Sequence, residues 1–183
     1  MTINITTENS VFLIIDIQEK LVNMLKEKIG ETCKKKSNIL IQISKKLNIK
    51  TIVTEQYPKG LGNTISSLTE HFSKETEIFE KTDFNALTTE GLKETIKEKE
   101  NIFVFGIETH ICVFQTVIDL LKENYNVFVI KDACASREKE EHKTALSLME
   151  KEGAKIITTE MVLFEFLKSS KHPLFKDLQG LIK

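Results

Sequence analysis

The chain has 183 residues, of which 40% are hydrophobic and 29% are charged, a composition typical of a single globular domain spanning residues 1–183. Acidic residues number 27 and basic residues 26, and this balance argues against a nucleic-acid or anionic-lipid partner. A domain of this size buries roughly 70% of the surface that its unfolded chain exposes, so it needs no metal or disulfide for stability.

The cysteine content and the first residues indicate where the protein resides. Three cysteines, an odd number without close pairing, argue against a disulfide framework and for a reducing compartment. Met1–Asn9 is polar and lacks the apolar stretch of a secretory signal, and no run approaches the ~20 apolar residues of a membrane span. We therefore expect a cytoplasmic protein with no membrane partner.

Two kinds of segment alternate along the chain. Short apolar runs, rich in valine, isoleucine and phenylalanine, predict strands that are buried on both faces. These strands are expected at Val11–Asp16, Thr51–Thr54, Glu77–Glu80, Asn101–Phe105, Asn126–Ile130 and Lys155–Thr158. Longer amphipathic segments predict helices at about Gln18–Leu47, Glu90–Lys99, Thr109–Glu123, Glu138–Glu152 and Thr159–Leu167. The first of these helices could break near Gly30.

The alternation of strands and helices predicts an α/β fold. Parallel β-α-β units with right-handed crossovers place helices on both faces of a sheet, so six strands give a three-layer α/β/α sandwich of Rossmann-like type. One long irregular connection, Glu55–Ser67, contains Pro58, Gly60 and Gly62. A loop of this length in a compact domain is often functional, although its glycines could simply turn the chain.

Three reactive or charged residues follow predicted strands, at the edge where open parallel sheets bind ligands. Asp16 follows four apolar residues, and it could be a buried site carboxylate or the N-cap of the next helix. Lys81 follows the third strand, where a lysine is usually solvated. Cys112 falls in the first helical turn after Gly106, where it could be a packing residue or a thiol activated by free N–H groups.

Together the three side chains form a coherent catalytic set. Cys112 would be the nucleophile, Asp16 the base that takes its proton, and Lys81 the cation that holds both anions. The N–H groups at the helix N-terminus could also serve as an oxyanion hole. We expect the helix N-terminus and Lys81 to lower the pKa of Cys112 and make it the most reactive thiol, whereas Cys33 has no cation arranged for it.

Three segments carry a resemblance to a known family. Residues 13–18, 80–84 and 106–113, which read LIIDIQ, EKTDF and GIETHICV, together resemble the isochorismatase-like cysteine hydrolases over nearly the whole chain. The resemblance implies a six-stranded parallel sheet in the order 3-2-1-4-5-6 and a catalytic triad of Asp16, Lys81 and Cys112. It also implies a non-proline cis peptide bond before Glu108 and an oxyanion hole formed by the N–H groups of Glu108 and Cys112.

A narrower resemblance bears on metal and cofactor binding. Residues 54–62, 131–137 and 172–176 look like the isochorismatase-domain-containing proteins of unassigned substrate. Nicotinamidases of the superfamily bind a metal through histidines in the loop after the second strand. That loop begins at Glu55 here and contains no histidine, and His71 is isolated. We therefore expect no metal and no cofactor.

The resemblance also implies a reaction and an assembly. A nucleophilic cysteine, which true isochorismatases lack, implies covalent acyl chemistry on an amide or related C–N bond of a small molecule. Gln18, Tyr57 and Phe84 are candidates to line the substrate pocket, although Phe84 could equally belong to the core. Members of the family self-associate, so a homo-oligomer, a dimer or higher, is expected.

Two other functions stay open at this point. In a redox role, Cys112 would be oxidised and Cys134 would be the resolving thiol, unless Cys134 is simply a small packing residue. In an assembly role, the hydrolase scaffold would bind without turnover, although the presence of all three triad residues argues against this. Glu108 and His110, beside the nucleophile, have no assigned role.

Overall fold

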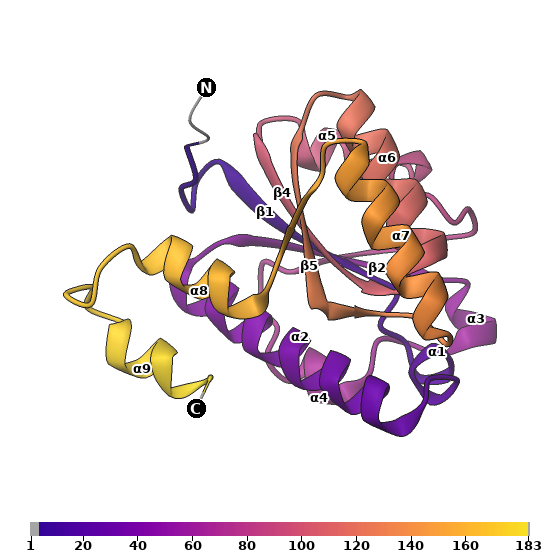
Figure 1. Ribbon diagram of the computed structural model, residues 1–183, viewed down its shortest axis with the longest axis horizontal. Coiled ribbons are helices and arrows are strands. Elements are labelled where there is room, and N and C mark those ends of the chain that lie inside the picture. The colour runs from indigo at the N-terminus through magenta and orange to yellow at the C-terminus, as the bar shows by residue number, and fades with distance from the viewer. Residues whose placement is uncertain (1–3, 183) are drawn as a thin grey trace.

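The computed structural model describes residues 4–182, in which six parallel strands form one sheet in the order β3-β2-β1-β4-β5-β6. The strands are β1 (Ser10–Ile15), β2 (Lys50–Gln56), β3 (Glu77–Lys81), β4 (Asn101–Ile107), β5 (Asn126–Ala135) and β6 (Lys155–Ile157). Helices cover both faces of this sheet (Figure 1). The predicted three-layer α/β/α sandwich and its strand order are confirmed.

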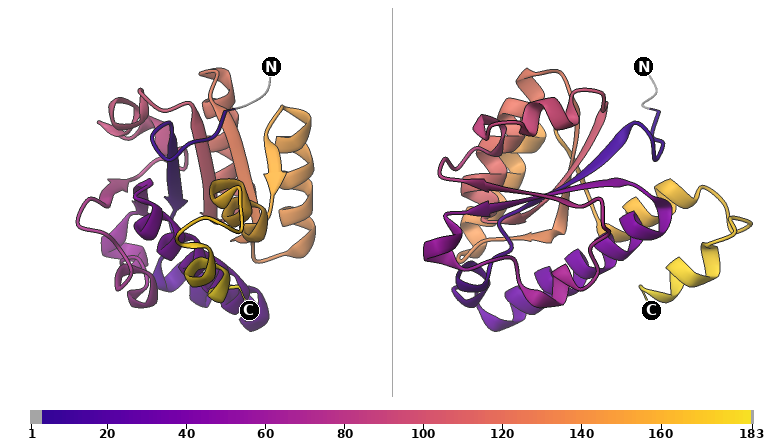
Figure 2. Two further views of the ribbon diagram at one scale, coloured as in Figure 1. Left: turned by 90° about the vertical axis from the view of Figure 1, so that its left-hand side faces the viewer. Right: turned by 180° about the vertical axis from the view of Figure 1, so that it is seen from behind.

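The helices divide between the two faces. They are α1 (Glu19–Asn23), α2 (Glu27–Leu47), α3 (Pro58–Leu61), α4 (Ser66–Thr69), α5 (Leu92–Ile96), α6 (Phe114–Lys122), α7 (Lys139–Lys151), α8 (Thr159–Leu167) and α9 (Phe175–Gly180). The long helix α2 shares one face with α4 and α8, and α5, α6 and α7 cover the other (Figures 1 and 2). A turn of π-helix at Thr109–Val113, here called the π-turn, joins β4 to α6.

The two central strands form the core of the molecule. Every residue of β1 and of β4 is buried. The ring of Phe12 packs on Phe103 and Phe105, with centroid distances of 5.4 and 6.2 Å. Full burial of one such side chain contributes about 1.5–3 kcal/mol to folding, so the residues that follow these strands are held on a rigid base. No helix within residues 4–182 is long and apolar enough to cross a membrane.

Two predicted boundaries were wrong for identifiable reasons. The first amphipathic segment breaks between Asn23 and Glu27, so Gly30 lies inside α2. A β-carbon at Gly30 would lie 3.6 Å from the Val22 carbonyl oxygen. Gly30 is therefore a position where α1 packs against α2, and it does not end a helix. Strand β5 continues five residues beyond its predicted end, because polar residues at 131–132 interrupt the apolar run without ending the strand.

The connection after β2 is shorter and more ordered than predicted. Strand β2 continues to Gln56, and the two short helices α3 and α4 occupy part of the following segment. Gln18, just after β1, forms an antiparallel bridge with Thr64. Its side-chain amide also donates to the carbonyl oxygens of Gln56 and Gly62, at 3.0 and 2.6 Å. The loop is therefore fixed to the end of β1.

Gly106 marks the closest approach of β4 to β1. Its φ is +139°, and a β-carbon there would lie 2.0 Å from the Ile15 carbonyl oxygen. Because that neighbour is backbone at the centre of the sheet, Gly106→Ala should lower the free energy of unfolding by about 3 kcal/mol or more. Gly180→Ala, at an open position, should change it by less than about 0.5 kcal/mol. Chemical denaturation measures both, and equal stabilities would contradict this account.

Candidate active site

Asp16 lies directly beyond the end of β1 and is fully buried. Its φ is +50°, a left-handed conformation that is uncommon outside glycine and that aspartate tolerates. One carboxylate oxygen, Oδ1, accepts a hydrogen bond of 2.6 Å from the hydroxyl of Thr54. The N-cap position of α1 is Gln18, not Asp16, and it makes no side-chain capping bond. Asp16 is thus a buried carboxylate held by the neighbouring strand.

Lys81, the last residue of β3, reaches across β2 to this carboxylate. Its side chain is 1% exposed, and its Nζ lies 2.7 Å from Oδ2 of Asp16. The ammonium also donates to Oε1 of Gln56 at 2.6 Å and to the carbonyl oxygens of Asp83 and Phe84 at 3.2 and 3.3 Å. A buried ion pair is stable only when its remaining hydrogen-bonding groups are satisfied, and Gln56 meets this need for Lys81.

The two oxygens of the Asp16 carboxylate have different partners. Oδ1 accepts the hydrogen bond from Thr54, and Oδ2 faces the Lys81 ammonium at 2.7 Å. Among residues 4–182 Oδ2 has no further hydrogen-bond donor.

Cys112 lies in the π-turn, which forms the first part of the helical segment predicted at Thr109–Glu123 and leads directly into α6. Its residue is 6% exposed. Burial, and then the charge of Asp16, raise the pKa of the Cys112 thiol to about 12, and the opposing charge of Lys81 is not sufficient to offset them. The expected lowering of this pKa was therefore wrong, because the loss of hydration and the carboxylate outweigh the cation. The charges of Asp16 and of Lys81 both act on the Cys112 thiol, so the thiol lies near their ion pair.

The thiol pKa values of the other two cysteines are also raised. Burial raises the pKa of Cys33 to about 12 and moves that of Cys134 upward as well. Cys33 and Cys134 line a common cavity between α2, β5 and α7, and the charge of Cys33 contributes to the shift at Cys134. Cys134 thus has Cys33 as a near neighbour. All three thiols are free.

The proposed oxyanion segment follows β4. The peptide bond between Ile107 and Glu108 is cis. Glu108 is 7% exposed and adopts an extended backbone, with φ −92° and ψ 143°, immediately before the π-turn. The N–H groups of Glu108 and Cys112 remain the predicted oxyanion donors.

Two residues of the site were missed in the sequence. Thr54 and Gln56, at the end of β2, bind Asp16 and Lys81 respectively. Gln56 is itself held through its backbone N–H by Gln18, at 2.7 Å, and through its side chain by the Thr82 carbonyl, at 2.6 Å. The available signal was their position at the carboxyl end of a strand, but their partners lie on the neighbouring strands and are not visible in the sequence.

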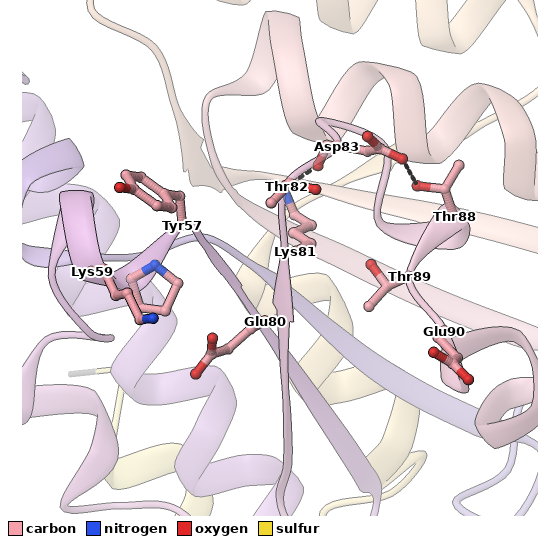
Figure 3. A pocket seen from close by; sticks show the side chains of 10 residues that line it. Tyr57, Lys59, Glu80, Lys81, Thr82, Asp83, Thr88, Thr89 and Glu90 are labelled. Carbon is pink, nitrogen blue, oxygen red and sulfur yellow. Dashed lines mark hydrogen bonds between the residues drawn. The ribbon is translucent and has the colours of Figure 1, made fainter.

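A cavity of about 450 Å³ opens beside the end of β3 (Figure 3). Tyr57, which is 56% exposed, lines it, whereas Phe84 is 52% exposed and lies outside the lining. Gln18 is fully buried and supports the loop. Lys81 is the one triad residue in the lining, so the cavity adjoins the triad without reaching Asp16 or Cys112. Tyr57 is thus placed to contact a ligand, and Phe84, with its side chain exposed, is not a core residue.

The raised pKa of Cys112 predicts how its alkylation depends on pH. Below a pKa of about 12 the thiolate fraction rises tenfold per pH unit, so alkylation of Cys112 by iodoacetamide should rise from pH 7 to pH 10 without levelling. At fixed pH, Asp16→Asn should accelerate alkylation because the carboxylate raises the thiol pKa, and Lys81→Met should slow it. Peptide mapping measures each rate. A plateau near pH 8 would contradict the raised pKa.

Metal ligands do not gather in the described part of the chain. Within residues 4–182 no group of three or more histidine, cysteine, aspartate or glutamate side chains is arranged to hold a metal ion. The loop after β2 contributes tyrosine, proline and lysine to the cavity in place of imidazoles.

The fold and the site define a Rossmann-like α/β protein with a buried carboxylate, lysine and thiol at the carboxyl edge of its sheet. Residues 10–161 match the isochorismatase domain family. The chain belongs to the isochorismatase family, and it has the fold of that family's hydrolases.

Individual relatives support this assignment over almost the full chain. Isochorismatase family protein 1A of Dictyostelium discoideum is 37% identical, over 96% of this chain and 86% of its own length. Isochorismatase domain-containing protein 2 of Xenopus laevis is 37% identical, over 95% and 83%. A solved structure described as the MAR1 ribonuclease from Caenorhabditis elegans superposes with a TM-score of 0.93 at 39% identity, covering 98% of this chain and 92% of that one. The resemblance to isochorismatase-domain-containing proteins is confirmed.

Proposed function

We propose that the protein is a cysteine-dependent hydrolase that cleaves an amide or related C–N bond of a small molecule through a thioester intermediate. The observation that carries this proposal is the buried contact of Lys81 with Asp16, 2.7 Å from Nζ to Oδ2, beside the thiol of Cys112. A nucleophile, a proton acceptor and a compensating cation within one buried cluster are the groups that acyl transfer requires.

In the proposed first half-reaction, Sγ of Cys112 forms a bond to the substrate carbonyl carbon while its proton passes to Oδ2 of Asp16. The N–H groups of Glu108 and Cys112 stabilise the oxyanion. When this intermediate collapses, the C–N bond breaks and Asp16 returns the proton to the leaving nitrogen. The enzyme is left as a thioester with an unprotonated Asp16.

In the second half-reaction, Asp16 takes a proton from water as the water oxygen attacks the thioester carbon. Collapse breaks the C–S bond, the acid product leaves, and the proton moves from Asp16 to sulfur. Lys81 keeps its charge throughout and compensates whichever of Asp16 and Cys112 is anionic.

The raised pKa of Cys112 fits this order of events. With a pKa of about 12, the thiol is neutral before substrate binds, so its proton must leave as the S–C bond forms. Oδ2 of Asp16, which has no hydrogen-bond donor among residues 4–182 besides the Lys81 ammonium that it faces, is the acceptor for that step. A preformed thiolate is thus not part of the proposal.

The name of the Caenorhabditis elegans neighbour suggests RNA as a second candidate substrate. The charge of the cavity argues against it. Three carboxylates, Glu80, Asp83 and Glu90, line the cavity together with two lysines. Lys81 is already paired with Asp16, and among the described residues Lys59 forms no ion pair. A strand of phosphates is attracted to basic grooves, and these carboxylates would repel it. We therefore propose a small-molecule substrate.

A substrate panel tests the proposal against both candidates. Purified protein and its Cys112→Ala variant are incubated with small primary amides, ureido compounds and amidines, and separately with a labelled single-stranded RNA. The proposal predicts amine or ammonia release from at least one small molecule by the wild type and none by the variant. RNA cleavage that persists in Cys112→Ala, with no release from any small molecule, would overturn it.

A further inference from the structure

Glu108 and the first two residues of the π-turn, Thr109 and His110, are each bonded through their side chains to the segment that follows β5. The bonded pairs are Glu108 with Arg137, Thr109 with His142, and His110 with Ser136. The segment Ser136–His142, here called the anchor segment, thus holds the stretch that contains the proposed oxyanion donor Glu108.

The strand register explains how the anchor segment reaches this place. Val104 pairs with Val129, yet Gly106 pairs with Cys134, so two residues along β4 correspond to five along β5. The extra residues form a bulge in β5. Beyond the bulge the two strands pair again, and the last residue of β4, Ile107, lies opposite the last residue of β5, Ala135. A bulge of this kind re-aims the residues that follow it.

Glu108 and Arg137 form the one ion pair among these three contacts. Oε1 of Glu108 accepts from the backbone N–H of Arg137 and from its Nε, each at 3.0 Å. The Glu108 side chain is 8% exposed and that of Arg137 is 47% exposed. A buried carboxylate without a partner is unfavourable, so Glu108 is held in this one orientation by two donors on the same residue.

The residue that holds Glu108 is an arginine, which is rare in this chain. Lysine and arginine together number 26 in the chain, and Arg137 is the only arginine. A guanidinium presents its N–H groups in a fixed plane, whereas a lysine ammonium is a flexible point charge. The one guanidinium of the chain thus holds the side chain of Glu108.

We propose that Arg137 is a positioning residue that fixes Glu108, and through it the N–H group that stabilises the oxyanion. This inference rests on the proposed function. Oxyanion donors are effective only when they are held in place before the reaction, and a donor at the junction of a strand and a turn needs support from a neighbouring element. Arg137 touches neither the thiol nor the substrate carbonyl in this scheme.

Two reagents separate positioning from general damage to the site. Acylation of Cys112 by p-nitrophenyl acetate passes through an oxyanion, whereas alkylation by iodoacetamide does not. Neither Glu108 nor Arg137 is among the groups that set the pKa of Cys112, so removing Arg137 should leave alkylation unchanged. Both rates are measured by intact mass and peptide mapping.

The expected result is a split between the two rates. Arg137→Ala should slow acylation by about 10- to 100-fold and change alkylation by less than about threefold. Arg137→Lys, which keeps the charge and the backbone N–H, should lose less acylation than Arg137→Ala and provides the test if the alanine variant does not fold. Lys26→Ala, which removes the exposed pair with the adjacent Glu138, is the matched control and should change neither rate.

Other outcomes would overturn the inference in distinct ways. Equal losses of acylation and alkylation in Arg137→Ala, or no loss of either, would show that Arg137 does not position an oxyanion donor. A wild-type protein that alkylates at Cys112 but never acylates there would overturn the proposed function, and this inference with it.

Discussion

Cys112→Ala should abolish hydrolysis of the substrate found in the amide panel, lowering kcat by about 10⁴-fold or more. The reason is that no other group can form the thioester, and water must then attack the amide directly. The replaced side chain is small and 6% exposed, so the fold should survive the change. Steady-state amine release measures the loss, and a thermal melt confirms that the variant is folded.

Cys33→Ala and Cys134→Ala are the matched controls for that loss. Both thiols are buried like Cys112, but they line the cavity between α2, β5 and α7, whose lining includes none of Asp16, Lys81 and Cys112. Each variant should keep activity within about threefold of the wild type. A large loss in Cys134→Ala, together with a disulfide to Cys112 under mild oxidation, would favour the redox role in place of hydrolysis.

Lys81→Met should destabilise the protein by about 3–5 kcal/mol as well as inactivate it. The substitution leaves the Asp16 carboxylate buried at 0% exposure without its cation, which was 2.7 Å away. Urea denaturation followed by circular dichroism measures the stability, and the same preparation is assayed for turnover. An unchanged midpoint would mean that the pair is not buried as described.

The double variant Asp16→Asn with Lys81→Met separates stability from catalysis. Removing both charges also removes the uncompensated carboxylate, so most of the lost stability should return. Activity should not return, because the proton acceptor is missing. Recovery of turnover in the double variant would show that Asp16 is not the base.

Much of the fold could be predicted because most strands contain a short apolar run and the longer helices are amphipathic. The carboxyl-edge rule also selected Asp16, Lys81 and Cys112, which the structure brings together. Thr54 and Gln56 were missed because hydrogen bonds across β2 depend on strand neighbours, which a linear pattern does not display. The role of Gln18 as a support for the loop was hidden for the same reason.

The pKa of Cys112 could not be predicted because two opposing effects had to be weighed. The sequence suggests the helix N-terminus and Lys81, which lower a thiol pKa, but it does not measure burial. In the folded protein, burial and the charge of Asp16 outweigh Lys81, and the pKa of Cys112 is raised. The small-molecule substrate, self-association and the pocket role of Tyr57 remain predictions.

The central claim is that a substrate acyl group becomes attached to Cys112 during turnover. Acid quenching of the enzyme within its first turnovers, followed by peptide mass spectrometry, tests this most directly. We expect the mass of the acyl group on the peptide that contains Cys112, absent from Cys112→Ala and released by hydroxylamine as the hydroxamate. Steady turnover without any adduct, or an adduct confined to Cys33 or Cys134, would contradict the account.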